Sequence, residues 1–188
     1  VFDRGTVPDD PANVRFGAID GAAALHLDGN YLQSAIAAAK YAKANGVKVS
    51  LDAGGLYPGI ETLLPYADIL IPSAEFAKGI TGKAEIPEAM AALAEKYRPE
   101  ILAVTDGSNG GYYWNGEKAV HYASVQVKAI DSNGAGDTFH GAFLAAYCGG
   151  KSVEECCRFA SAVAAYKCTH KGARTYPLSM EIAENLIG

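Results

Sequence analysis

The segment that most constrains this chain reads Asp131-Ser132-Asn133-Gly134-Ala135-Gly136-Asp137-Thr138-Phe139. It follows a strand-like run at residues 124–130 and opens an apolar run that predicts a helix. Gly134 and Gly136 leave room for a ligand at the backbone, and a helix start offers unpaired N–H groups beside the positive end of the helix dipole. The pattern predicts an anion hole for a phosphate, with Asp137 in the same turn as a base. A helix start with Asp and Gly chosen only for capping is the competing explanation.

Strand-like and helix-like runs alternate upstream of this segment. The expected strands are residues 23–27, 47–51, 68–71 and 101–105, and the expected helices are residues 32–44, 60–66, 74–80 and 87–97. This order predicts an α/β fold with a doubly wound, mainly parallel sheet and helices on both faces. Ligands of such sheets bind at the carboxyl ends of the strands. The sequence places four polar residues at these ends: Asp28, Asp52, Ser73 and Asp106.

The rest of the chain predicts a hairpin and three further helices. Asn115-Gly116 favours a tight turn between strands at residues 112–114 and 119–123. The helices are expected at residues 135–147, 153–169 and 179–186. No internal repeat or interdomain linker separates these elements, so residues 1–188 are expected to form a single domain.

The composition argues against several classes of function. The 188 residues carry a formal net charge of −5 and their basic residues are scattered, which argues against a nucleic-acid partner. No apolar run reaches the roughly 18 residues of a membrane span, and residues 1–10 do not resemble a signal peptide. The cysteines form no Cys-x-x-Cys pair and predict reduced core thiols of a cytoplasmic protein: Cys148, Cys156, Cys157 and Cys168.

Residues 131–139 resemble the C-terminal signature of the ribokinase (pfkB carbohydrate kinase) family, Asp-Thr-x-Gly-Ala-Gly-Asp-x-Phe, with Ser132 in place of the commoner Thr. Leu25–Gly29 resembles a strand end of ketohexokinase-like members. The resemblance spans nearly the whole chain, but only the later part of such proteins. It implies a partial ribokinase-like domain, without the upstream strands and the β-lid. The chain begins without Met and with strand-like residues, so we expect its true N-terminus to precede Val1, the alternative being a truncated member of the family. The resemblance also implies transfer of the γ-phosphate of ATP to a hydroxyl of a small carbohydrate.

The resemblance implies roles for particular residues. Asp137 becomes the catalytic base. Thr105–Gly111 is similar to the loop that lies along ATP in the family, and residues 152–167 are similar to the helix beside the adenine. The anion hole is assigned to Gly134, Ala135 and Gly136. The ATP site is assigned to Asp52, Ser73, Thr105, Asp106, Gly107, Ser108, Gly110, Ser161 and Gly172.

The metal sites of the family are altered or implied here. In its Asn-x-x-Glu motif, which organises Mg²⁺ and phosphate through water, Ser73 replaces the Asn and Phe76 replaces the Glu. Glu75, one position early, is either a water-mediated Mg²⁺ ligand or a solvated charge at a helix start. The resemblance also implies a monovalent cation such as K⁺, bound by the Asp131 side chain and the Asn133 carbonyl. Its shell is completed by carbonyls near Lys167, His170 and Gly172.

The substrate follows from the same resemblance. His140 stands where relatives often have Asn, so it either contacts the substrate or ATP or is a polar residue of the helix start. The expected partners are a small sugar and a second copy in a homodimer, with no nucleic acid and no membrane, and the expected cofactors are ATP, Mg²⁺ and K⁺. A nucleoside or phosphosugar kinase on the same fold remains open, as does a catalytically inactive nucleotide-binding module.

Overall fold

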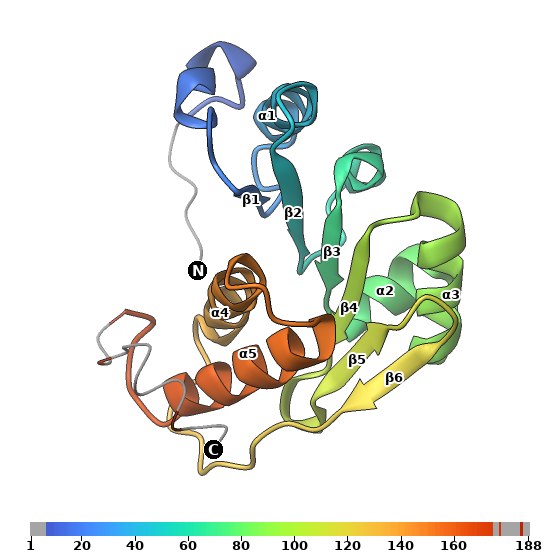
Figure 1. Ribbon diagram of the computed structural model, residues 1–188, viewed down its shortest axis with the longest axis vertical. Helices are drawn as coiled ribbons and strands as arrows, with labels where there is room; N and C mark the ends of the chain where they lie inside the picture. Colours follow the sequence, from blue (N-terminus) through green and yellow to red (C-terminus); the bar gives the residue numbers. More distant parts are fainter. Residues whose placement is uncertain (1–6, 175–176, 178–184, 186–188) are drawn as a thin grey trace.

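A computed structural model describes residues 7–174, 177 and 185 of the chain. Within these residues one sheet carries its strands in sequence order, with β1 to β4 parallel and β5 and β6 antiparallel (Figure 1). The mainly parallel sheet and the hairpin predicted from the sequence are both confirmed. The strands are β1 (Ala24–Leu27), β2 (Lys48–Ala53), β3 (Ile69–Pro72), β4 (Ile101–Thr105), β5 (Gly111–Trp114) and β6 (Ala119–Tyr122).

The helices lie close to their predicted positions. The long helices are α1 (Leu32–Ala44), α2 (Ala74–Thr81), α3 (Ile86–Tyr97), α4 (Ala135–Cys148) and α5 (Val153–Cys168). The helix expected at 60–66 is instead two 3-10 turns, because Pro65 has no N–H with which to continue an α-helix. The remaining 3-10 turns are Pro11–Asn13, Phe16–Ala18 and Gly107–Asn109. The helix predicted at 179–186 lies outside the described residues.

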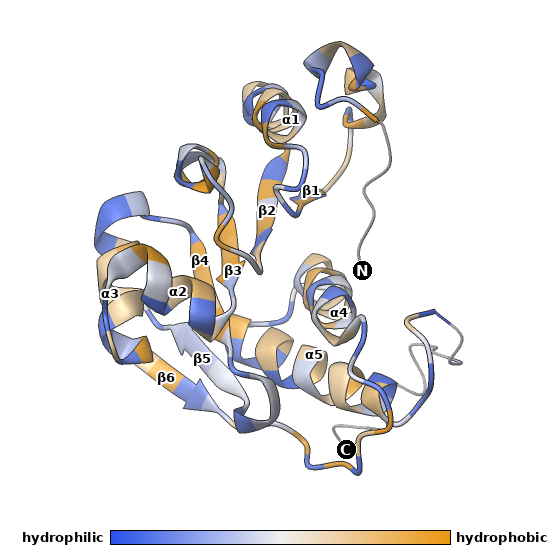
Figure 2. Ribbon diagram, turned by 180° about the vertical axis from the view of Figure 1, so that it is seen from behind, coloured by the Kyte–Doolittle hydropathy of each residue, from blue (hydrophilic) through white to orange (hydrophobic). Residues whose placement is uncertain are grey.

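Alternating side chains of the central strands build two cores, one on each face of the sheet. Leu70 and Leu102 pack toward α1, α2 and α3, whereas Ile69 and Ile71 pack toward α4 and α5. Figure 1 shows the two groups of helices on opposite sides of the sheet, and Figure 2 shows β3 and β4 as almost entirely hydrophobic. Both faces are therefore covered, as the sequence predicted for a doubly wound sheet.

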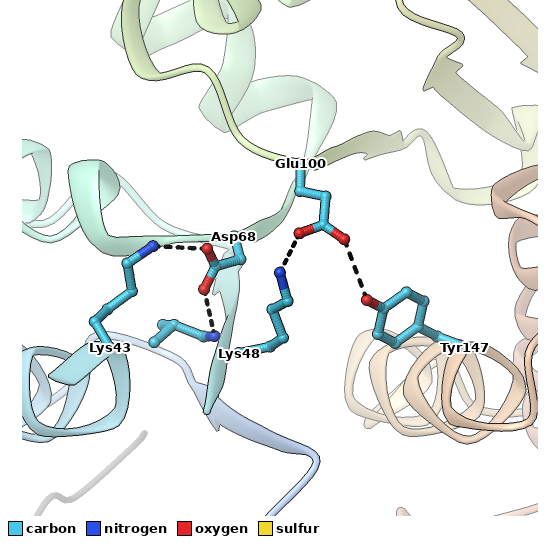
Figure 3. Close-up of polar contacts among 6 residues, drawn as sticks. Lys43, Lys48, Asp68, Glu100 and Tyr147 are labelled. Carbon is cyan, nitrogen blue, oxygen red and sulfur yellow. Dashed lines mark hydrogen bonds and ion pairs between the residues drawn. The ribbon is translucent and has the colours of Figure 1, made fainter. Parts of the chain in front are cut away.

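A network of charged side chains ties the amino ends of the strands together (Figure 3). Lys43 Nζ lies 2.6 Å from a carboxylate oxygen of Asp68, and Lys48 pairs with Glu100. The Tyr147 hydroxyl donates to the other oxygen of Glu100 at 3.4 Å. Ion pairs this exposed contribute little stability, so the network chiefly fixes how α1 and α4 meet the sheet. It lies at the opposite end of the strands from the expected ligand site.

Two further predictions from the sequence are wrong. Residues 124–130 form no strand: Val125, Val127 and Ile130 are exposed, and the segment leaves the sheet after β6 to reach α4. The alternation of apolar residues that suggested a strand has no sheet partner there. All four cysteines are free, but Cys148 is exposed at the end of α4 and is no core thiol. In the part of the chain that the structure describes, none of the helices combines the length and the apolar character that crossing a membrane requires.

Candidate active site

The polar residues predicted at the strand ends lie at one edge of the sheet. Asp28 follows β1, Asp52 is the next-to-last residue of β2, and Ser73 and Asp106 directly follow β3 and β4. Parallel strands bring their carboxyl ends to the same edge, so these residues converge although they are far apart in sequence. The placement inferred from the sequence is confirmed.

The start of α4 combines a required glycine with two backbone amides that lack an acceptor among the described residues. Gly134 precedes the helix with φ 79° and ψ 10°, and a Cβ there would lie 2.8 Å from Cβ of Ala173, so glycine is required both by conformation and by space. The Ala135 amide donates to the Ser132 carbonyl at 3.0 Å and is engaged within the loop. Among the described residues, the Gly136 and Asp137 amides have no hydrogen-bond acceptor. These are the N–H groups that an anion can take.

Open space surrounds these two amides. A Cβ added at Gly136 would have no atom within 4 Å, although the backbone there is ordinary helix. The Asp137 side chain, in the first turn of α4, is exposed. A ligand can therefore reach the helix start and the carboxylate together.

A cavity of about 290 Å³ begins at this helix start. Its walls come from the loop after β4, the segment at 124–129, the first turns of α4 and the inner face of α5. Five of the residues predicted for ATP line it together with two of the anion hole: Thr105, Gly107, Ser108, Gly110, Ser161, Ala135 and Gly136. Residues that sequence reasoning did not assign complete the wall: Ser124, Val125, Gln126, Val127, Ala129, Ser132, Phe139, Ala164, Ala165 and Cys168.

The loop after β4 owes its shape to internal contacts. Asp106 does not line the cavity; its amide donates to the Gly110 carbonyl at 2.8 Å, and its carboxylate accepts from the Asn109 side chain at 3.0 Å. Gly110 has φ 88°, and a Cβ there would lie 2.0 Å from the Tyr122 carbonyl. On the cavity side, the Gln126 side chain donates to the Ser108 carbonyl at 3.1 Å. The loop is thus held in place by its own residues, β6 and the 124–129 segment.

Besides Asp106, three residues predicted for ATP lie outside the cavity lining: Asp52, Ser73 and Gly172. The Ser73 hydroxyl accepts the Phe76 amide at 3.1 Å and caps α2, which gives Ser73 a structural role. Glu75 is exposed in the first turn of α2. Within the residues that the structure describes, no three His, Cys, Asp or Glu side chains gather as metal ligands.

A polar cluster on β1, β2 and α4 adjoins the helix start. His140 is only 3% exposed, its Nε2 lies 3.2 Å from Asp52 Oδ2, and its buried Nδ1 has no partner among the described residues. Its ring centroid is 5.1 Å from that of His26, whose Nδ1 is hydrogen-bonded to the Ser50 hydroxyl at 3.1 Å. His140 is therefore a buried, paired residue and not merely a polar residue of the helix start.

The charge of the predicted base, Asp137, is among those that act on His26 in this cluster. Desolvation, followed by the neighbouring His140, lowers the pKa of His26, while Asp52, Asp28 and Asp137 act in the opposite direction. His26 is therefore neutral, although several carboxylates lie near it. Sequence reasoning missed His26, because its only signal was a polar residue in an otherwise apolar strand and its partners lie on other elements.

Comparison with known proteins agrees with this geometry. Residues 6–180 match the family described as pfkB family carbohydrate kinase. A ribokinase of Haemophilus influenzae is 35% identical over 154 residues, which are 79% of this chain and 50% of that protein, and a ribokinase of Arabidopsis thaliana is 35% identical over 145 residues, which are 73% of this chain and 38% of that protein. The chain thus spans half or less of the length of these curated relatives.

Solved structures show the same fold. The structure of Arabidopsis thaliana ribokinase complexed with ribose and ATP superposes with a TM-score of 0.81 at 31% identity, covering 92% of this chain and 58% of that one. A putative ribokinase II from E. coli, in its apo form, gives a TM-score of 0.85 at 22% identity, covering 94% and 62%. The match of the family over nearly the whole chain, with the signature at the start of α4, leads to one conclusion: this chain belongs to the pfkB family of carbohydrate kinases.

Proposed function

We propose that this chain binds Mg²⁺·ATP and transfers the γ-phosphoryl group to a hydroxyl of a small carbohydrate. One observation carries the proposal: Gly136, whose amide is open, lines a cavity together with the strand-end loop, and the exposed Asp137 carboxylate follows it in the same turn of α4. A base, unpaired amides and a nucleotide-sized cavity are what phosphoryl transfer requires of a protein.

Each part has a distinct task in this scheme. Asp137 takes the proton of the attacking hydroxyl, and the amides of Gly136 and Asp137 stabilise the negative charge on the transferring group. Val125 and Phe139 offer apolar surface for the base of the nucleotide. Mg²⁺ would arrive with ATP and neutralise phosphate charge, since no protein cluster of ligands exists among the described residues; Glu75, exposed on α2, is proposed to reach it only through water.

The sugar is proposed to lie beside His26, His140 and Asp52, next to the base. Asp28, Asp52 and Asp137 make this end acidic, so a phosphosugar would bring a second phosphate against carboxylates, which disfavours that alternative. The Arabidopsis thaliana ribokinase was solved in complex with ribose, a neutral sugar, which supports a neutral sugar here as well. A nucleoside remains a second candidate, because the same polar groups can bind its ribose.

Two further features are proposed from the family resemblance, a homodimer and a cytoplasmic location. Sedimentation and localisation of a tagged protein test them one by one. The resemblance also implies a monovalent cation at Asp131 and Asn133, and titration with KCl tests whether one binds there.

The proposal is tested by coupled ADP release with a panel of sugars, phosphosugars and nucleosides, on the protein that carries this chain. Turnover of one sugar that falls by a factor of about 10²–10⁴ in Asp137→Asn supports the base, since general-base catalysis contributes about that much. ATP binding measured by calorimetry is expected to survive the substitution. Undiminished turnover in the variant would exclude Asp137 as the base, and binding without any turnover would favour a nucleotide-binding module.

A further inference from the structure

A lysine is completely buried behind the start of α4. Lys167, in the last turn of α5, is 0% exposed, and its Nζ donates to the main-chain carbonyl of Asp131 at 2.7 Å. Burying an ammonium costs free energy unless the group is paired and hydrogen-bonded. A fully buried lysine in this position therefore indicates a specific role. The carboxyl end of α5 favours a positive charge, but a surface lysine would meet that need at less cost.

The loop that Lys167 contacts is the one that leads into the anion hole. Cys168 accepts the amides of Ile130 and Asp131 with its carbonyl at 2.7 and 3.1 Å. The Asp131 carboxylate accepts the Asn133 amide at 2.9 Å with one oxygen and the Gly172 amide at 2.9 Å with the other. These contacts bind residues 130–133 to the end of α5, and the Lys167 ammonium adds a side-chain donor to them.

Two of the ligands expected for a monovalent cation, the Asp131 carboxylate and a carbonyl near Lys167, belong to these groups and are already engaged. The Asp131 carboxylate oxygens and the Cys168 carbonyl already accept amides, and the Asp131 carbonyl accepts the ammonium. A dissolved cation bound to the Asp131 carboxylate would lie near the Lys167 ammonium, a like charge that opposes its binding. An ammonium has the same charge as K⁺ and a similar size, and it binds carbonyl oxygens in the same way.

We propose that the Lys167 ammonium acts as a built-in monovalent cation, which positions the 131–134 loop and puts a fixed positive charge behind the anion hole. Lys167 is a positioning residue and touches no substrate. Nucleotide binding and turnover then have no need of K⁺. This inference rests on the proposed function only for its effect on ATP; the effect on the loop is independent of it.

The cation dependence of the native protein is the first test. Thermal melting, calorimetric ATP binding and turnover are compared in KCl and in tetramethylammonium chloride at equal ionic strength. The native protein is expected to give the same values in both salts. A several-fold gain in affinity or turnover in KCl, or a higher melting temperature in KCl, would overturn the inference.

A charge-removing variant is the second test. Lys167→Met keeps an unbranched side chain and deletes the ammonium, so ATP affinity is expected to fall about 10- to 100-fold in tetramethylammonium chloride, as happens when supports of a bound group are lost. KCl is expected to restore much of this loss and to raise the melting temperature of the variant, which a merely structural lysine would not explain. Lys83→Met, an exposed control, is expected to behave as native in both salts.

Failure of this inference can be told apart from failure of the proposed function. If no nucleotide binds to the native protein, melting in the two salts still reports whether K⁺ stabilises the native protein or Lys167→Met. If Lys167→Met does not fold, the native comparison decides alone. A variant that folds, binds ATP as native in tetramethylammonium chloride and ignores KCl would refute the role of Lys167.

Discussion

The Nε2 atom of His140 lies 3.2 Å from the Oδ2 atom of Asp52, which links the second turn of α4 to the end of β2. The imidazole is buried, whereas the carboxylate faces the ligand side of the sheet with part of its surface exposed. α4 begins at the proposed anion hole, and β2 is a strand of the sheet that α4 packs against. This pair therefore helps to hold α4 in place on the end of β2.

A double-mutant cycle on this pair measures that link. Asp52→Ala is expected to cost about 1–3 kcal/mol of unfolding free energy, because it leaves a buried ring nitrogen without its partner. Combining it with His140→Ala is expected to show a coupling of about 0.5–3 kcal/mol in denaturant unfolding. Glu95→Ala, which removes an exposed carboxylate on α3, is the control. Strictly additive effects of the two substitutions would contradict the pairing.

The stability of the fold is expected to depend on the protonation of His26. Partial desolvation of the ring lowers its pKa in the folded chain, so below about pH 6.5 the unfolded chain binds this proton more readily. The stability that the neutral His26 ring contributes is therefore fully present above about pH 6.5 and is lost as the pH falls from there toward the lowered pKa. Urea unfolding between pH 8 and 5 is expected to show this slope, and His26→Gln to flatten it. An equal slope in the variant would assign the effect to other groups.

Gly136 is expected to serve ligand access and not the fold. Gly136→Ala adds a methyl into open space on a helical backbone, so stability is expected to be unchanged or up to about 1 kcal/mol higher. The same methyl lies in the cavity wall beside the open amide, so ATP affinity is expected to fall. Gly141→Ala is the matched control, since it lies on the same helix with equally open space and does not line the cavity. If calorimetry shows native ATP affinity in Gly136→Ala, the Gly136 amide does not bind the phosphate.

The sequence predicted those features that are written in local patterns. Apolar runs such as that around Leu70 and helical runs such as that of α3 identified the elements, and the order of elements placed Asp52 and Asp106 at one edge. The segment from Asp131 identified the helix start, because Gly134 is needed both by a backbone with positive φ and by a close approach to Ala173. Local patterns thus located the site before any contact was known.

The same local patterns could not predict contacts between residues that are distant in the sequence. The pairing of Lys167 with Asp131 joins residues 36 positions apart, and the neighbourhood of His26 and His140 joins the first strand to a helix much later in the chain. The exposed run at 124–130 shows the converse error, because Val125 and Val127 alternate as in a strand while they are exposed and line the cavity. Alternation of apolar residues therefore does not by itself show that a segment pairs with a sheet.

The thiols provide a last test of the packing between α4 and α5. Burial raises the pKa of Cys156 to about 11 and also raises the pKa of the Cys157 thiol, so neither forms the reactive thiolate at pH 8. Cys148 is exposed and is expected to be alkylated first by iodoacetamide, followed by the half-buried Cys168. Because Cys168 lines the cavity, ATP is expected to slow its reaction and not that of Cys148.

Peptide mass spectrometry over a time course distinguishes the four sites, with Cys148→Ser as the control that removes the fast phase. Rapid modification of Cys156 or Cys157 in the folded chain would mean that α5 opens from the sheet on the timescale of the reaction. Protection of Cys168 by ATP, with Cys148 unaffected, would place the nucleotide against the inner face of α5. Equal rates for Cys168 with and without ATP, under conditions where calorimetry shows binding, would place it elsewhere.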